Sequence, residues 1–216
     1  MRLTHVESNH AIEIDDITGL PSSIKRSGKG SSFEFSIITS LKIETGGGER
    51  RNPVGGLEYF ETTWSDKVKK IGEPFISQSG EGVTWVIPVE IGPATAQLTY
   101  KFNRNGPAIS FGVNFLGNQN LVVRNLVAEL NVELAKGNWI ANVPGNGLRS
   151  NIQLQELADS TGISPMGGLR GSSGLVHLSE PDLDKSFVLW VDGDLEIPEV
   201  EIQGLSQSKV RLNIKS

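Results

Sequence analysis

The sequence contains no cysteine among its 216 residues. This absence excludes a disulfide framework, a thiolate nucleophile and a zinc site built from cysteine ligands. A chain without cysteine suits a reducing compartment, but it also suits many exported bacterial proteins. The cysteine count therefore leaves both a cytoplasmic and an exported location open.

Long apolar runs are also missing. No stretch reaches the roughly 20 consecutive apolar residues that a membrane-spanning helix needs, so we expect no membrane partner. Met1–His10 contains no apolar segment, and we expect no signal peptide in this chain.

Clustered positive charge is scarce. The chain has 20 basic and 25 acidic residues, a formal net charge of −5, and charges of both signs are spread along it. Nucleic-acid binding needs grouped Lys and Arg side chains, so we expect no nucleic-acid partner. The one short basic run, Lys67–Lys70, is interpreted as a solvated strand end or loop.

Short alternating runs and turn-forming residues are abundant. Glycine accounts for 25 residues, which favours tight turns. Ala96–Phe102 and Ala108–Phe115 alternate in matching phase around an Asn-Gly pair, which predicts a β-hairpin. Leu121–Glu133 is long enough for a helix, but its β-branched residues favour a strand. Similar patterns predict strands at residues 11–15, 32–37, 41–44, 82–89, 175–178, 185–191, 195–202 and 210–214.

The segments between these runs are expected to be turns, loops and one short helix. The strand at 41–44 is expected to stop at Gly46–Gly48, and Pro88 indicates a sheet edge or a bulge. Gly167–Gly174 is interpreted as a flexible loop. It does not match a phosphate-binding P-loop, because it lacks the Lys-Ser/Thr ending of that motif. Asn151–Ala158 is the helix candidate, with Ser150 as its N-cap.

These patterns together predict an all-β fold, an antiparallel two-sheet β-sandwich with at most one short helix. We expect residues 1–216 to form a single β-sandwich domain, either alone or as one domain of a larger protein.

Metal ligation and acid catalysis have little support in the sequence. The chain has three histidines, His5, His10 and His177, and the first two lie near the N-terminus. His177 is interpreted as a structural histidine of a strand, with contact to a ligand as the alternative. The acidic pairs at 182–184 and 192–194 flank one strand and are explained by turn chemistry. We expect no metal and no cofactor, and the sequence does not identify catalytic residues.

The segment Asn138–Arg149 has the composition of a sugar-binding loop. Proteins bind sugars with aromatic faces that stack on the ring, while planar polar groups hold the hydroxyls. Arg170, flanked by glycines, adds a donor fork that suits the carboxylate of an acidic glycan. The alternative is that Trp139 closes the core and Arg149 pairs with a structural carboxylate. The predicted carbohydrate-binding residues are Trp139, Asn142, Asn146, Arg149, Arg170 and His177.

Three segments carry a resemblance to a known family. Asn9–Ile24 resembles the first hairpin of galactose-mutarotase-like β-supersandwich domains, which open with a strand, a Thr-Gly turn and a second strand. Gly82–Phe115 is similar to the long paired strands of those domains. Trp139–Arg149 resembles sandwich domains attached to glycoside hydrolases and polysaccharide lyases.

The departures from that family limit what the resemblance implies. Mutarotases carry a histidine in an Asn-x-x-x-His-x-Tyr-Phe-like stretch, a second histidine and a late Glu base, and this sequence lacks such a stretch. The resemblance therefore implies the fold and a carbohydrate context rather than epimerase activity.

From these implications we expect a carbohydrate-associated, non-catalytic domain of a glycan-degrading enzyme, with other domains of the same polypeptide as partners. Two alternatives stay open. One is a stand-alone sugar-active enzyme that uses carboxylates, whether hydrolase, lyase or epimerase. The other is a structural or interaction domain without a ligand.

Overall fold

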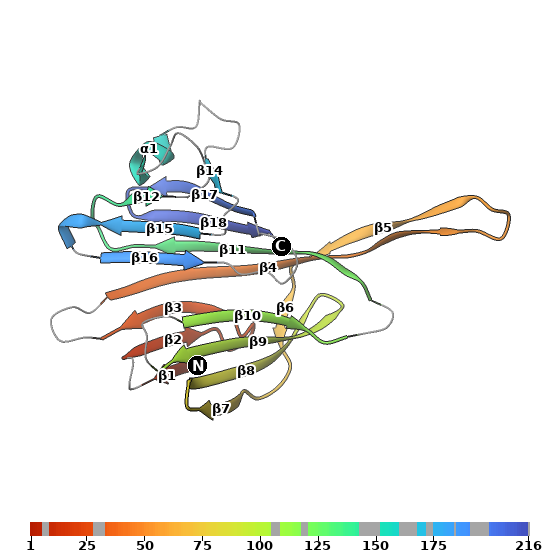
Figure 1. Cartoon of the computed structure of the whole chain (residues 1–216), viewed down its shortest axis with the longest axis horizontal. Helices are drawn as coiled ribbons and strands as arrows, with labels where there is room; N and C mark the ends of the chain where they lie inside the picture. Colours follow the sequence, from red (N-terminus) through yellow and green to blue (C-terminus); the bar gives the residue numbers. More distant parts are fainter. Residues whose placement is uncertain are drawn as a thin grey trace. The chain divides into compact units, whose positions relative to one another are not determined.

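Antiparallel strands make up nearly all of the computed structural model, and the α-helical content is one short helix among the described residues (Figure 1). This confirms the predicted all-β, antiparallel fold class. No helix in the described part of the chain is long and apolar enough to cross a bilayer. The structure describes residues 1–5, 9–27, 33–104, 109–117, 121–142, 152–159, 168–171, 175–183, 185–190 and 199–215.

The chain divides into two compact units. The first comprises residues 1–32 and 40–126, and the second comprises residues 33–39 and 127–216. The long strand β4 (Phe33–Arg51) therefore contributes residues to both units. Whether the two units together form the single domain expected from the sequence stays a prediction.

The first unit contains a three-stranded segment, a long two-stranded ribbon and a five-stranded sheet in the order β10-β9-β8-β6, with β7 paired to β8. The strands of the three-stranded segment are β1 (Arg2–His5), β2 (His10–Ile14) and β3 (Pro21–Arg26). The ribbon joins β4 to β5 (Leu57–Ser65). The five-stranded sheet is built from β6 (Val68–Lys70), β7 (Phe75–Ser79), β8 (Gly82–Ile91), β9 (Ala94–Asn103) and β10 (Ile109–Phe115).

The second unit contains the strand order β11-β18-β17-β14, with β11 from residue 127 onward, and a four-stranded sheet in the order β13-β12-β15-β16. The strands of the first set are β11 (Val123–Glu133), β14 (Gly168–Gly171), β17 (Glu199–Ser206) and β18 (Lys209–Lys215). Those of the second are β12 (Ile140–Asn142), β13 (Ile152–Gln153), β15 (Leu175–Glu180) and β16 (Lys185–Trp190). The helical segments are α1 (Leu154–Asp159) and a 3₁₀ turn, Pro181–Leu183.

The core of the first unit follows the two-residue period of its strands. In β9 every second residue from Ala94 to Phe102 is buried, because alternate side chains of a strand face opposite ways. Tyr100 is one of them, and its hydroxyl donates a hydrogen bond of 2.7 Å to the carbonyl oxygen of Gly19. Gly19 has a φ of 76°, and a Cβ there would lie 3.1 Å from Ile87 Cγ2. The predicted Thr-Gly turn is thereby held against the five-stranded sheet.

The pairing of β9 with β10 confirms the predicted hairpin. The strands run antiparallel from Phe102↔Ile109 to Ala96↔Phe115. The Asn-Gly pair itself lies outside the described residues.

The expected strand end at Gly46–Gly48 is wrong. Strand β4 continues to Arg51, and its pairing with β5 keeps one register on both sides of these glycines. Gly46 and Gly47 take φ values of 82° and 72°, which glycine adopts without steric cost. A Cβ at Gly47 would also lie 2.6 Å from the Arg124 Nε atom. The glycines therefore do not end the strand. They leave space for the Arg124 side chain to lie against the ribbon.

Three smaller expectations are changed by strand pairing. Gly168–Gly171 forms β14 and pairs with β17, so this part of the expected loop is a strand. The helix starts at Leu154 rather than Asn151, because residues 152–153 pair with β12. Pro88 lies where β8 changes partner from β6 to β7, a point at which its missing N–H is not required.

The buried Tyr100 hydroxyl makes protein stability depend on alkaline pH. Burial raises the pKa of Tyr100 well above its ordinary value, whereas a tyrosine in the unfolded chain ionises near pH 10. The hydroxyl therefore stabilises the fold fully below about pH 10 and loses this contribution as pH rises towards the folded-state pKa. Urea unfolding should show Tyr100→Phe to be less stable than wild type by about 1 kcal/mol at pH 8, with a smaller difference at pH 11. The same difference at both pH values would contradict this account. The other tyrosine, Tyr59, is present in both proteins.

Candidate functional site

Two of the six predicted sugar-binding residues lie side by side in the second unit. Asn142 on β12 is the direct cross-strand partner of His177 on β15. Arg170 lies on β14 opposite Glu201 of β17, and the structure describes its backbone alone. Asn146 and Arg149 lie outside the described residues.

Trp139 belongs to the core, which is the alternative that the sequence left open. The residue is 1% exposed, and its indole Nε1 donates a hydrogen bond of 2.8 Å to the carbonyl oxygen of Ala135. Its ring meets Phe35 edge-on at a centroid distance of 6.5 Å, and Phe35 meets Phe187 in the same manner at 5.4 Å. The ring faces are covered by protein, so this structure corrects the expectation of Trp139 as a stacking platform.

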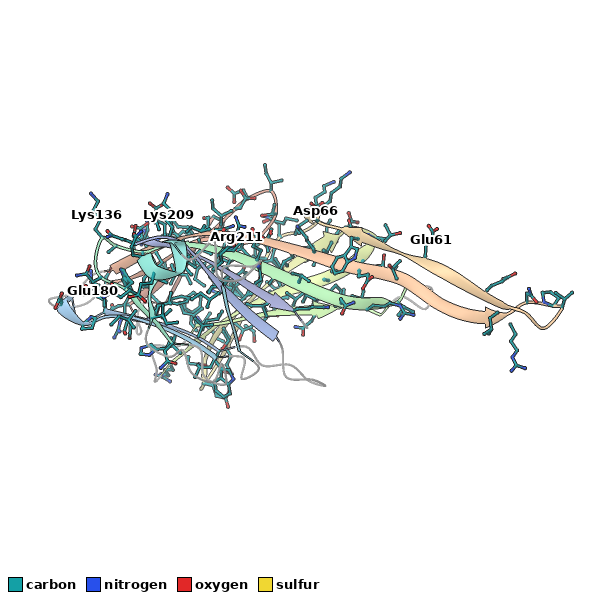
Figure 2. All side chains as sticks on the ribbon, turned by 90° about the horizontal axis from the view of Figure 1, so that it is seen from above. Glu61, Asp66, Lys136, Glu180, Lys209 and Arg211 are labelled. Carbon is teal, nitrogen blue, oxygen red and sulfur yellow. The ribbon has the colours of Figure 1, made fainter. Side chains whose placement is uncertain are left out.

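A buried carboxylate holds the segment before Trp139 in place. Glu180, labelled in Figure 2, is 2% exposed, and its Oε1 atom accepts a hydrogen bond of 2.9 Å from the backbone N–H of Asn138. A Cβ at Gly137 would lie 2.7 Å from Glu180 Cγ, so glycine is required for this approach. On the other side, the N–H of Leu154 donates to the carbonyl oxygen of Trp139 at 2.9 Å. The carboxylate of Glu180 therefore has a structural role.

The four-stranded sheet has one buried face and one open face. Along β15, Val176, Leu178 and Glu180 are buried, while the residues between them are partly exposed. Along β16, Val188 and Trp190 are 58% and 74% exposed. Asn142 and His177 share the open face with these residues, because direct cross-strand partners point to the same side of a sheet.

The register arranges this open face in rows. Asn142, His177 and Val188 form one row across β12, β15 and β16. Leu175 and Trp190 form the adjacent row, two residues further along the strands. Neighbouring strands lie about 4.8 Å apart, so the first row spans roughly 10 Å. An amide, an imidazole and an indole therefore lie within the length of one or two sugar rings.

Trp190 was missed by the sequence analysis, which placed it within a strand and gave it no role. The outward position of Trp190 could have been predicted from the alternation of residues in β16. Ser186 is polar and lies an even number of residues before Val188 and Trp190, so all three share the outward face of this strand. The open face is thus formed by the two rows, Asn142, Leu175, His177, Val188 and Trp190.

The open face carries an amide, an imidazole, an indole and two aliphatic side chains. None of its residues is a carboxylate. Among the described residues, no group of three or more His, Asp or Glu side chains could hold a metal ion.

Comparisons with known proteins found no similar protein. No family model, curated protein or solved structure matches the chain. The resemblance to galactose-mutarotase-like domains therefore stays a prediction.

The two tryptophans of the second unit are expected to respond differently to truncation. Trp139→Ala removes a buried ring and should lower the free energy of unfolding by about 3–5 kcal/mol. Trp190→Ala is the matched control, because an exposed side chain should change it by no more than about 0.5 kcal/mol. Urea unfolding monitored by circular dichroism measures both. Equal losses in the two variants would contradict the assignment of one ring to the core and the other to the surface.

Proposed function

We propose that this chain is a carbohydrate-associated, non-catalytic β-sandwich domain of a glycan-degrading enzyme, and that it binds saccharide on the open face of its four-stranded sheet. The observation that carries the proposal is Trp190, whose side chain is 74% exposed beside the Asn142–His177 pair.

An exposed indole next to planar polar groups suits the two surfaces of a sugar. The C–H face of a pyranose is apolar and packs on an aromatic ring, while its hydroxyl groups need donors and acceptors at the edge. The Asn142 amide offers both a donor and an acceptor, and a neutral His177 imidazole does the same. Leu175 and Val188 surround Trp190 with apolar surface. The open face therefore supplies a stacking surface with hydrogen-bonding groups along one side.

The lack of carboxylates on the open face supports binding without turnover. Hydrolysis of a glycosidic bond ordinarily requires two carboxyl groups about 5–10 Å apart across the scissile bond. Glu180, the nearest acid along β15, is buried on the opposite face and bonded to the backbone of Asn138. This arrangement favours an accessory role, and the resemblance to domains of glycoside hydrolases and polysaccharide lyases supplies the enzyme context.

A second candidate function is a protein-contact face without a saccharide ligand. The exposed apolar side chains of Val188 and Trp190 favour it, since aromatic residues are enriched at protein interfaces. The two candidates differ in their response to soluble saccharides, which only the first predicts will bind.

Truncation of Trp190 tests the proposed function. Trp190→Ala should weaken binding to a glycan-array hit by about 5- to 30-fold, which corresponds to about 1–2 kcal/mol of stacking energy. Asn142→Ala and His177→Ala should each weaken it several-fold. Phe75→Ala is a matched aromatic control, because Phe75 is 58% exposed on β7 of the first unit.

Three results would contradict the proposal. They are no binding of the wild-type chain to any saccharide on the array, equal binding by wild type and Trp190→Ala, and release of sugar from a bound polysaccharide. The last result would replace the accessory role with catalysis.

A further inference from the structure

A cleft of about 590 Å³ lies in the first unit, where the ribbon meets the five-stranded sheet. Its lining residues come from β4, β5, the link to β6, β6 itself, the end of β8 and the turn between β8 and β9. The polar side chains among them are Thr45, Thr63, Ser65, Lys67, Lys69 and Glu90. A volume of this size is within the range of small-molecule sites and exceeds that of a simple inorganic ion.

Strand register brings these polar groups to one side. Thr45 is the cross-strand partner of Thr63, and Lys69 is the partner of Glu90. Thr63 and Ser65 are two residues apart on β5 and therefore share one face of that strand, whereas Lys67 lies in the link to β6 and Lys69 lies on β6. Trp64, between Thr63 and Ser65 on β5, also lines the cleft, and it is the cross-strand partner of Glu44.

The wall of the cleft is held in place by the turn between β8 and β9. The N–H of Gly92 donates a hydrogen bond of 2.8 Å to the carbonyl oxygen of Lys67. Gly92 has a φ of 55°, and a Cβ there would lie 2.3 Å from Ser65 Oγ. The turn therefore packs directly on Ser65 and fixes the backbone that carries Lys67.

The charges of the cleft select a singly charged ligand. Two lysines and one glutamate leave one net positive charge among the lining side chains. Lys67 and Lys69 make no ion pair with any side chain that the structure describes. Asp66, labelled in Figure 2 next to the ribbon, is not part of the lining. Glu90 would repel a polyanion but can accept hydrogen bonds from hydroxyl groups.

We propose that this cleft binds a saccharide with a single carboxylate, of the uronic acid class, with Lys67 and Lys69 holding the carboxylate. Thr63, Ser65 and Glu90 then bond the ring hydroxyls. The site is separate from the open face of the four-stranded sheet, and it gives Lys67 and Lys69 a role beyond that of a solvated strand end.

NMR titration with the sodium salts of galacturonic and glucuronic acid tests this proposal. The amide signals of Lys67 and Gly92 should shift on titration, and galactose and glucose should produce no such shift. Lys67→Gln/Lys69→Gln should weaken binding at least about tenfold, because charge-assisted hydrogen bonds are lost. Lys70→Gln removes the same charge from a residue of the same strand that does not line the cleft, and should change affinity by less than about twofold.

Further variants keep the test decisive. Glu90→Gln should tighten binding of the acidic sugar, because it removes the one negative charge of the lining. Trp190→Ala should leave the titration unchanged, so a failed proposal for the open face does not affect this result. The cleft proposal is overturned if neutral sugars or sodium acetate cause the same shifts at equal concentration. It is also overturned if the folded double lysine variant binds as wild type does, or if wild type shows no shift.

Discussion

The two-residue period of the β-strand is the constraint on which both candidate sites depend. Because successive side chains point to opposite faces, each strand divides its residues between a buried and an open side. In β15 this division buries Val176 and Leu178 and leaves His177 on the open side. In the first unit the same period places Thr63 and Ser65 of β5 on one face of their strand, and both line the cleft. A register shift of one residue would exchange the two faces and remove both sites.

The two tryptophans of the second unit differ in burial, and only Trp190 lies on a strand. Trp139 fills the core of the second unit and is fixed there by Phe35 and by the backbone around it. Trp190 is an outward residue of β16, and its ring contributes little to the core. The same residue type therefore packs in the core at one position and is exposed at the other.

Local patterns predicted the strands well, since alternation is a property of neighbouring residues. The β9–β10 hairpin and the strand at β11 follow from such patterns. The errors arose where distant residues decide the structure. The ribbon continues through Gly46 and Gly47, where Arg124 packs against it from 78 positions away.

The candidate sites were predictable only in part for the same reason. Asn142 and His177 were predicted individually, but their adjacency depends on the pairing of β12 with β15. The burial of Trp139 depends on Glu180, which binds the preceding residue from 42 positions away. The cleft was not predicted at all, because the turn at Gly92 and the start of β6 meet only in the folded unit.

Thiol labelling of single-cysteine variants tests the assignment of faces most directly, since the natural chain has no cysteine. Ser186→Cys and Val188→Cys should react with a maleimide at nearly the rate of a free thiol under native conditions. Val176→Cys and Leu178→Cys, which are fully buried positions, should react only after unfolding in urea. Fast labelling at Val176 or Leu178 in the folded protein, or protection at Val188, would contradict the account.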